Sequence, residues 1–286
     1  MPVVYAAIAT PLDAAGAFDK PAMSRLIQNL YRAGVDGVVP CGTTGEGPSL
    51  SVAERLEIIK HCVSSRDGRG VIAGTGCQSL SDTITLSRAA LAAGADACLV
   101  LPPFFFKQAG ENGVIAWYQA LCDALPAGSK LILYHIPPMT GVPITTYIID
   151  TLLASHPTYI AGIKDSGVDA AHTAMLTARY PQLAIYTGNA PILAQAIKDG
   201  AVGSILAIAN IVPRSVRILT DDPTRTDAQA HLAAVDGHVR KAGAVATIKA
   251  ILAQSGIPVG APLPPQLAHP DAAATYHAFC EFPAPQ

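Results

Sequence analysis

The hydrophobic positions of the chain gather in eight short runs that are separated by longer segments with helical periodicity. Each run is rich in aliphatic and β-branched residues, which is typical of strands, and each intervening segment is long enough for a helix. This alternation predicts repeated βα units. The runs cover residues 3–9, 36–41, 70–75, 96–101, 130–135, 159–164, 183–187 and 202–208.

The runs are almost continuously hydrophobic and do not alternate between hydrophobic and polar residues. Parallel strands that are covered on both faces have this property. Gly34, Gly94 and Gly200 stand at similar places before three of the runs, where a helix must end before a strand begins. We therefore predict an α/β fold, a single TIM (β/α)8 barrel, over residues 1–220.

The strand pattern stops after residue 220. Residues 224–242, 244–255 and 271–280 have the periodicity of helices, and a proline-rich segment joins the last two. We predict that residues 221–286 form a C-terminal helical extension that packs on the outside of the barrel.

Composition narrows the classes of partner. The chain of 286 residues is half hydrophobic and only 14% charged, so its polar surface is thin and contacts between subunits are favoured. Its formal net charge is −2 and it contains no basic run, which argues against nucleic acid and membrane surfaces as partners. The N-terminus lacks a secretory signal, and no apolar run reaches the roughly 20 residues that span a bilayer. We expect a cytoplasmic protein.

The cysteines and histidines do not form the patterns of a metal site. Six cysteines are scattered without a C-x-x-C pair, and we interpret them as free, largely buried thiols. The eight histidines include no H-x-x-x-H pair beside a carboxylate, which argues against a zinc site. We expect no metal.

In a barrel of this kind, reactive side chains gather at the carboxyl ends of the strands. Lys164 closes the sixth run, so its side chain can lean into the barrel mouth, away from bulk water. Burial disfavours the charged form of an amine, and a neutral amine can attack a carbonyl carbon. The alternative is a lysine that extends from a strand end into solvent. The polar residues at the strand ends are Thr10, Thr43, Thr44, Glu46, Tyr134, His135, Lys164 and Asp165.

Tyr134 ends the run before that of Lys164, so the two side chains can share one pocket. A phenol in that pocket could move the proton that must leave and return while a carbinolamine and an enamine form. The alternative is a buried tyrosine whose hydroxyl merely finds a hydrogen-bond partner. The remaining seven lysines fall on helix-like stretches, a strand start or a loop, and Lys249 is among those on helices.

The loop Gly42 to Gly47, with the sequence GTTGEG, follows the second run and leads into a helix that we expect to start near Ser51. Glycines such as Gly42 let the backbone approach a ligand, while two adjacent hydroxyls and exposed N–H groups suit a carboxylate. An ordinary Gly/Thr turn is the alternative. Neither a Walker loop nor a G-x-G-x-x-G dinucleotide motif is present.

Three motifs together resemble the dihydrodipicolinate synthase/N-acetylneuraminate lyase family of class I aldolases. They are GTTGE at Gly42 to Glu46, Y-x-I-P-x-x-T-G at Tyr134 to Gly141, and GIKDS at Gly162 to Ser166. The likeness runs from Ala6 to about residue 260. In this order, and at the ends of the second, fifth and sixth strands, the three motifs are far more specific than any one of them alone.

The resemblance implies a role for each matching residue. Lys164 would form a Schiff base with pyruvate or another 2-oxo acid, and Tyr134 would be the proton shuttle. Thr43 and Thr44 would hold the substrate carboxylate and the Tyr134 hydroxyl, while Gly188 and Ile205 would line the pocket. No cofactor is implied, because the iminium itself serves as the electron sink. A homotetramer or homodimer is expected.

Two positions depart from the dihydrodipicolinate synthases of that family. Those enzymes carry a tyrosine in a P-Y-Y segment that completes a proton relay across a dimer interface, where this chain has Phe104, Phe105 and Phe106 after Pro103. They also carry an arginine for the aldehyde's carboxylate where this chain has Met139, so a charge-assisted bidentate contact is missing. We expect Phe105 and Met139 to line the aldehyde half of the pocket.

These departures shape the expected substrate. The continuation Gly47 to Ser51, GPSLS, resembles the 2-keto-3-deoxy sugar-acid aldolases, which release pyruvate and an aldehyde. We therefore expect a 2-keto-3-deoxy sugar-acid aldolase or dehydratase, and a less polar aldehyde would also suit Met139. The alternatives are a 4-hydroxy-tetrahydrodipicolinate (dihydrodipicolinate) synthase with an altered relay and a catalytically silent paralogue that binds a 2-oxo acid.

Overall fold

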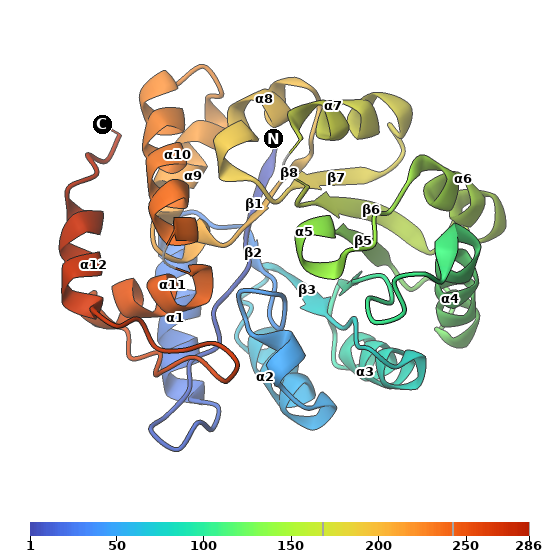
Figure 1. Cartoon of the computed structure of the whole chain (residues 1–286), viewed down its shortest axis with the longest axis horizontal. Coiled ribbons are helices and arrows are strands. Elements are labelled where there is room, and N and C mark those ends of the chain that lie inside the picture. The colour runs from blue at the N-terminus through green and yellow to red at the C-terminus, as the bar shows by residue number, and fades with distance from the viewer. Residues whose placement is uncertain (168, 242, 286) are drawn as a thin grey trace.

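Eight parallel strands close into a barrel in their sequence order (Figure 1). The computed structural model describes residues 1–167, 169–241 and 243–285, and the strand count refers to these residues. Seven of the predicted hydrophobic runs contain one strand each, and the sixth run, 159–164, ends one residue before its strand does, which confirms the predicted barrel. The strands are β1 (Val3–Ala6), β2 (Gly37–Val38), β3 (Gly70–Gly74), β4 (Ala97–Val100), β5 (Leu131–His135), β6 (Ile160–Asp165), β7 (Ala184–Thr187) and β8 (Gly203–Leu206).

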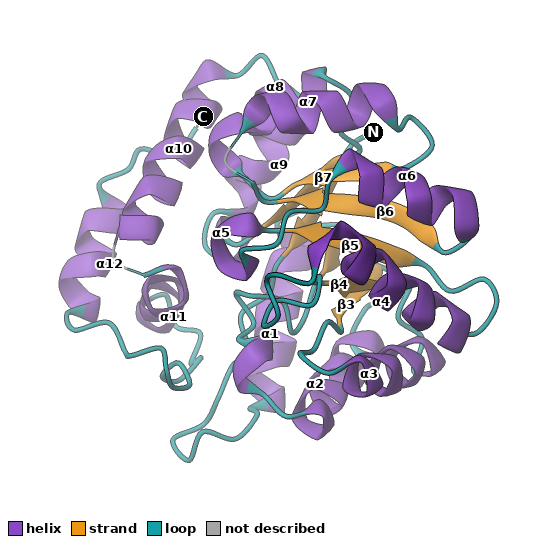
Figure 2. Ribbon diagram, turned by 45° about the vertical axis from the view of Figure 1, so that its right-hand side comes forward, coloured by secondary structure: helices purple, strands orange, loops and turns teal. Residues whose placement is uncertain are grey.

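Helices connect successive strands and surround the barrel (Figure 2). No helix within the described residues combines the length and the hydrophobicity that crossing a bilayer requires. The helices that follow the eight strands are α1 (Lys20–Arg32), α2 (Val52–Ser64), α3 (Leu80–Ala92), α4 (Gly110–Ala124), α5 (Pro137–Thr140), α6 (Thr146–Ser155), α7 (Ala170–Arg179), α8 (Leu193–Lys198) and α9 (Pro213–Asp221), with short 3₁₀ turns at η1 (Gly47–Ser49), η2 (Ala190–Ile192) and η3 (Ile208–Asn210).

Local sequence signals set the helix ends. Helix α2 begins after Ser51, as predicted, because the Ser51 hydroxyl accepts from the Glu54 N–H at 3.3 Å while the Glu54 carboxylate accepts from the Ser51 N–H at 2.8 Å. Gly94 and Gly200 end their helices with φ of 102° and 100°, in the left-handed region that favours glycine. The predicted turn glycines therefore have a conformational reason.

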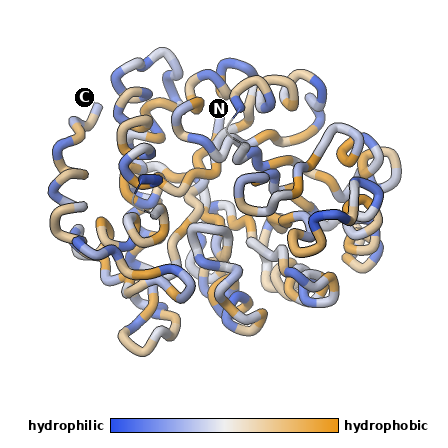
Figure 3. Tube along the Cα trace, viewed as in Figure 1, coloured by the Kyte–Doolittle hydropathy of each residue, from blue (hydrophilic) through white to orange (hydrophobic). Residues whose placement is uncertain are grey.

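The core has an inner and an outer layer. Side chains of a strand alternate in direction, so Ile132 and Tyr134 of β5 point into the barrel while Leu131 and Leu133 pack against the surrounding helices. The helices in turn alternate between hydrophilic and hydrophobic positions along their length (Figure 3). The six cysteines are free and four are buried, as predicted.

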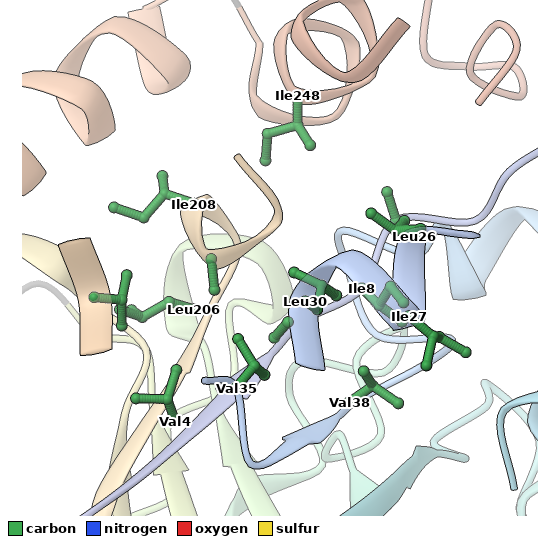
Figure 4. Packing of buried hydrophobic residues seen from close by; sticks show 14 of the residues in the cluster. Val4, Ile8, Leu26, Ile27, Leu30, Val35, Val38, Leu206, Ile208 and Ile248 are labelled. Atoms are coloured by element: carbon green, nitrogen blue, oxygen red, sulfur yellow. The ribbon is translucent and has the colours of Figure 1, made fainter. Parts of the chain in front are cut away.

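The C-terminal helices pack on the outside of the barrel, as predicted. They are α10 (Thr226–Lys241), α11 (Ala244–Gln254) and α12 (Ala272–Cys280). Ile248 of α11 belongs to the same buried cluster as Leu26 of α1 and Ile208 after β8 (Figure 4). The apolar face of α11 is therefore buried against the barrel. The predicted ends at residues 242 and 286 lie outside the described residues.

Candidate active site

The register of two neighbouring strands brings Tyr134 and Lys164 together. They are direct partners in the β5–β6 ladder, and both side chains point into the barrel mouth. The Lys164 Nζ donates to the Tyr134 hydroxyl at 3.2 Å, and the Thr43 hydroxyl lies 3.2 Å from the same oxygen. The three side chains form a continuous polar chain, as the sequence predicted for Lys164 and Tyr134.

Lys164 is buried, with only 3% of its surface exposed. Its Nζ lies 4.3 Å from the centre of the Tyr134 ring, over the ring face. Among the described residues, no carboxylate lies within 4.0 Å of this nitrogen. The alternative of a lysine that extends into solvent is therefore wrong. A buried amine that is not paired with a carboxylate is available for reaction with a carbonyl group.

The surroundings of Tyr134 favour loss of its proton. Burial alone raises the pKa of the phenol, but the Lys164 charge and hydrogen bonds from Thr43, Lys164 and Ser166 outweigh it. The pKa of Tyr134 is consequently below its usual value of 10.0. A phenol with a lowered pKa gives up its proton more readily than an ordinary tyrosine and can take it back within the same pocket. Ser166 was not predicted as a site residue, although it closes the GIKDS motif.

The GTTGEG loop is a closed turn that presents Thr43 to Tyr134. The Gly47 N–H donates to the Gly42 carbonyl at 3.0 Å, and the Glu46 N–H donates to the Thr43 carbonyl at 3.1 Å. Thr44 is buried beside Thr43. A Cβ on Gly42 would meet nothing within 4 Å, so the backbone there is open to an approaching group.

A small cavity at the barrel mouth adjoins this loop. Arg55 of α2, which is buried, borders it and holds the end of β3 through hydrogen bonds to the carbonyls of Gly74 at 2.6 Å and Gly76 at 3.1 Å. Arg55 was not predicted as a site residue, because an arginine on a helix that follows a strand is ordinarily at the surface. The cavity is lined by Cys41, Gly42, Thr43, Pro48, Arg55, Gly74, Gly76, Leu99, Leu101 and Tyr134.

The other predicted pocket residues fall into two groups. Ile205 lies in the inner barrel cluster with Tyr134, and Gly188 lies against Ser166, which a Cβ at position 188 would displace. Met139 of α5 and Phe105 of the β4–α4 loop are each 69% exposed at the surface. The structure thus places Ile205 beside Tyr134 and Gly188 beside Ser166. The roles of all four residues in a substrate pocket stay predictions.

His135 and Asp165 follow Tyr134 and Lys164 and therefore point the opposite way, out of the barrel. Asp165 accepts from the His172 Nδ1 at 3.0 Å, from the Thr173 hydroxyl at 2.7 Å and from the Gly167 N–H at 3.0 Å. These two strand-end residues do not join the polar chain. Asp165 fastens β6 to α7 behind it, and His135 of β5 accepts from the Ile144 N–H at 3.1 Å.

His135, Asp165 and His172 are residue types that can bind a metal ion. Ligand atoms of His135, Asp165 and His172 lie within 4.8 Å of one another. However, the two imidazole rings are stacked, with centroids 4.5 Å apart and planes at 23°, so their lone pairs run side by side and do not converge. Burial lowers the pKa of His135 to about 4, and the hydrogen bond that His172 donates to Asp165 raises the pKa of His172. The geometry fits a hydrogen-bonded cluster better than a metal site.

Comparisons with known proteins agree with this geometry. The sequence profile of the Dihydrodipicolinate synthetase family matches residues 2–275. An uncharacterized DapA-like lyase from Chloroflexus aurantiacus is 45% identical over 254 residues, which are 87% of this chain and 85% of that protein. A 4-hydroxy-tetrahydrodipicolinate synthase from Synechococcus sp. (strain CC9605) is 35% identical over 272 residues, which are 92% of this chain and 88% of that protein.

A solved structure gives the same result. YagE, a prophage protein of the dihydrodipicolinic acid synthase family from E. coli K12, was crystallised in complex with pyruvate. It superimposes with a TM-score of 0.91 at 27% identity, and the match covers 100% of this chain and 99% of YagE. By its profile, its relatives and its fold, this chain belongs to the dihydrodipicolinate synthetase family.

Proposed function

We propose that this protein is a Schiff-base-forming carbon–carbon lyase that acts on pyruvate or a related 2-oxo acid. The observation that carries the proposal is the buried chain from the Lys164 Nζ through the Tyr134 hydroxyl to the Thr43 hydroxyl, with 3.2 Å at each step. It provides a nucleophile and a proton carrier in one pocket. The pyruvate complex of YagE supports the same class of substrate.

The chemistry follows from these positions. The Lys164 amine attacks C2 of the 2-oxo acid, and the resulting carbinolamine loses its hydroxyl as water after Tyr134 delivers a proton. Tyr134, now a phenolate, takes the proton of the C4 hydroxyl, the C3–C4 bond breaks, its electron pair moves toward the iminium to give an enamine, and C4 leaves as the carbonyl carbon of the aldehyde. With pyruvate alone, Tyr134 takes a C3 proton and the same enamine forms. Protonation at C3 and hydrolysis release pyruvate and free Lys164. Thr44 and the N–H groups of the GTTGEG loop would hold the carboxylate throughout.

For the second half of the substrate, we propose a 2-keto-3-deoxy sugar acid, which an aldolase would cleave to pyruvate and an aldehyde or a dehydratase would dehydrate. Met139 stands where the synthases of the family have their arginine for a carboxylate, so a second carboxylate has no guanidinium at that position. The GPSLS continuation after the loop supports the same substrate class. The second candidate is a 4-hydroxy-tetrahydrodipicolinate synthase, because several relatives with about a third identical residues carry that name.

Reductive trapping tests the mechanism directly. The protein is incubated with pyruvate and borohydride, and its intact mass is measured beside that of Lys164→Ala. We expect a pyruvyl adduct on the wild type that is absent from the variant. No adduct on wild-type protein that is folded by circular dichroism would refute the Schiff-base mechanism.

Turnover then separates the substrate classes. Release of pyruvate from 2-keto-3-deoxy sugar acids would support the proposed specificity, whereas condensation of pyruvate with aspartate semialdehyde would establish the synthase. An adduct without turnover of either kind would support a protein that only binds a 2-oxo acid.

We also propose that the chain assembles as a homodimer or homotetramer. Phe105 and Phe106 stack edge to face with ring centroids 5.2 Å apart, and both are largely exposed, as is Met139. Exposed aromatic side chains of this kind favour burial against another subunit. Sedimentation of the wild type and of Phe106→Glu tests this. A monomeric wild type would contradict it.

A further inference from the structure

A buried ion pair joins the GTTGEG loop to the C-terminal helices. The Lys249 Nζ of α11 lies 2.5 Å from the Glu46 Oε1, and the two side chains are 2% and 1% exposed. Each partner is also held by backbone of the segment that follows α11: the Glu46 Oε2 accepts from the Leu263 N–H at 2.5 Å, and the Lys249 Nζ donates to the Ala261 carbonyl at 3.1 Å. The loop is therefore fastened from outside the barrel.

The segment that follows α11 lies beside two loops of the barrel, the loop after β1 and the loop after β2. The Leu12 N–H, after β1, donates to the Val259 carbonyl at 3.0 Å. Gly260 has φ of 65°, and a Cβ there would collide with the Leu12 carbonyl. In Figure 1 the chain after α11 passes next to the loop between β2 and α2, where Leu263 meets Glu46. The C-terminal extension thus contacts the same end of the barrel as the candidate active site.

Energetics indicate a positional role for the pair. Burying two charges carries a desolvation penalty that their attraction only partly offsets, so such a pair adds little net stability. Glu46 also has φ of 58°, a left-handed conformation that is unfavourable for a side chain with a Cβ by about 1 kcal/mol. A strained residue with a buried charge keeps one position only when its surroundings fix it. Lys249 and Leu263 supply that fixation.

The position of Glu46 determines that of Thr43. The Glu46 N–H donates to the Thr43 carbonyl at 3.1 Å and closes the turn. The Thr10 hydroxyl holds the turn from the other side by donating to the Gly45 carbonyl at 2.7 Å. If Glu46 moves, the turn moves with it, and the Thr43 hydroxyl leaves its place 3.2 Å from the Tyr134 hydroxyl.

We propose that Glu46 and Lys249 are a positioning pair through which the C-terminal extension holds Thr43 against Tyr134. This inference rests on the proposed function, because it assigns the pair to the proton path of that reaction. Neither residue touches the substrate. Their effect passes through the loop to the Tyr134 hydroxyl.

The test measures proton transfer separately from Schiff-base formation. Exchange of the pyruvate methyl protons in D₂O, followed by NMR, reports enamine formation and needs no knowledge of the second substrate. Borohydride trapping at saturating pyruvate counts the molecules whose Lys164 is competent. The ratio of exchange rate to trapped adduct is compared among wild type, Glu46→Gln and Lys249→Met. A merely structural role would lower both quantities together and leave their ratio unchanged.

A matched control is the ion pair between Arg217 and Asp36, at 2.9 Å, which lies near the amino ends of the strands. Arg217→Met loses an ion pair that is partly exposed, at 17% and 38%, and lies away from the loop, so its ratio stays at the wild-type value. The double variant Glu46→Gln/Lys249→Met removes both buried charges and keeps the test valid if a single variant does not fold.

We expect the ratio to fall by about tenfold to a hundredfold in the Glu46 and Lys249 variants, the usual consequence of a displacement near 1 Å in a catalytic group. Unchanged ratios in these variants, with wild-type protein active, would overturn the positioning pair. Absence of both adduct and exchange in the wild type would instead refute the proposed function, so the two failures are distinguishable.

Discussion

Replacement of Tyr134 by phenylalanine tests the proton carrier with the smallest change that the structure allows. The ring stays under the Lys164 Nζ, 4.3 Å from its centre, so the amine keeps its place. Only the hydroxyl is lost, together with its contacts to Lys164 and Thr43 at 3.2 Å and its hydrogen bond from Ser166. The variant therefore separates the proton-transfer role of Tyr134 from its packing role.

The expected magnitudes differ for rate and stability. A positioned acid–base group contributes about 10²- to 10⁴-fold to a rate, and we expect the exchange of pyruvate methyl protons to fall by that factor. The hydroxyl is buried and its loss leaves the Lys164 Nζ without this acceptor, so the free energy of unfolding should fall by about 1–3 kcal/mol. Such a loss leaves most molecules folded.

The assay is proton exchange by NMR, with urea unfolding to measure stability and borohydride trapping to count competent Lys164. Tyr186→Phe is the matched control, because Tyr186 of β7 is the ladder partner of Lys164 on its other side. It should exchange at the wild-type rate. An exchange rate for Tyr134→Phe close to that of the wild type would refute the proton-carrier role.

Three further predictions follow from packing and charge. Gly188→Ala should displace Ser166 and slow proton exchange without preventing the pyruvate adduct; retained exchange would contradict this role. Ile248→Ala should lower the free energy of unfolding in urea by about 2–5 kcal/mol, whereas Leu267→Ala, at a side chain 79% exposed, should change it by about 0.5 kcal/mol or less. Burial lowers the pKa of His135 to about 4, below its value of 6.5 in the unfolded chain. The neutral imidazole therefore stabilises the fold fully above pH 6.5, and this contribution to the free energy of unfolding is lost as the pH falls toward 4. Urea unfolding should show a loss of about 3 kcal/mol over this range that His135→Gln abolishes.

Much of the barrel could be predicted because its strands are covered on both faces. A buried parallel strand needs a nearly continuous hydrophobic run, and each of the eight runs coincides with a strand to within a few residues at its ends. The predicted strand ends differ from the observed ones by one to a few residues, mostly because the hydrophobic run continues past the last residue that pairs with a neighbouring strand. The lysine at the end of such a run could likewise be placed in the barrel mouth from sequence alone.

Side-chain direction and distant pairing could not be predicted in the same way. His135 and Asp165 read as strand-end candidates like their neighbours, but strand alternation turns them out of the barrel. Lys249 read as an ordinary helical lysine, although its place in the apolar stretch AVATIKAIL is a signal of burial.

Hydrophobic pattern and short motifs were sufficient to predict the fold class, the strands that carry the reactive residues, and Lys164 and Tyr134 as the candidate pair, because these features are local in the sequence. The resemblance did not say which of Thr43 and Thr44 holds the Tyr134 hydroxyl; the folded chain brings Thr43 to 3.2 Å from it, and it also pairs Glu46 with Lys249. Contacts between residues far apart in the chain depend on the closure of the barrel and the packing of α11 against it. No local pattern encodes them.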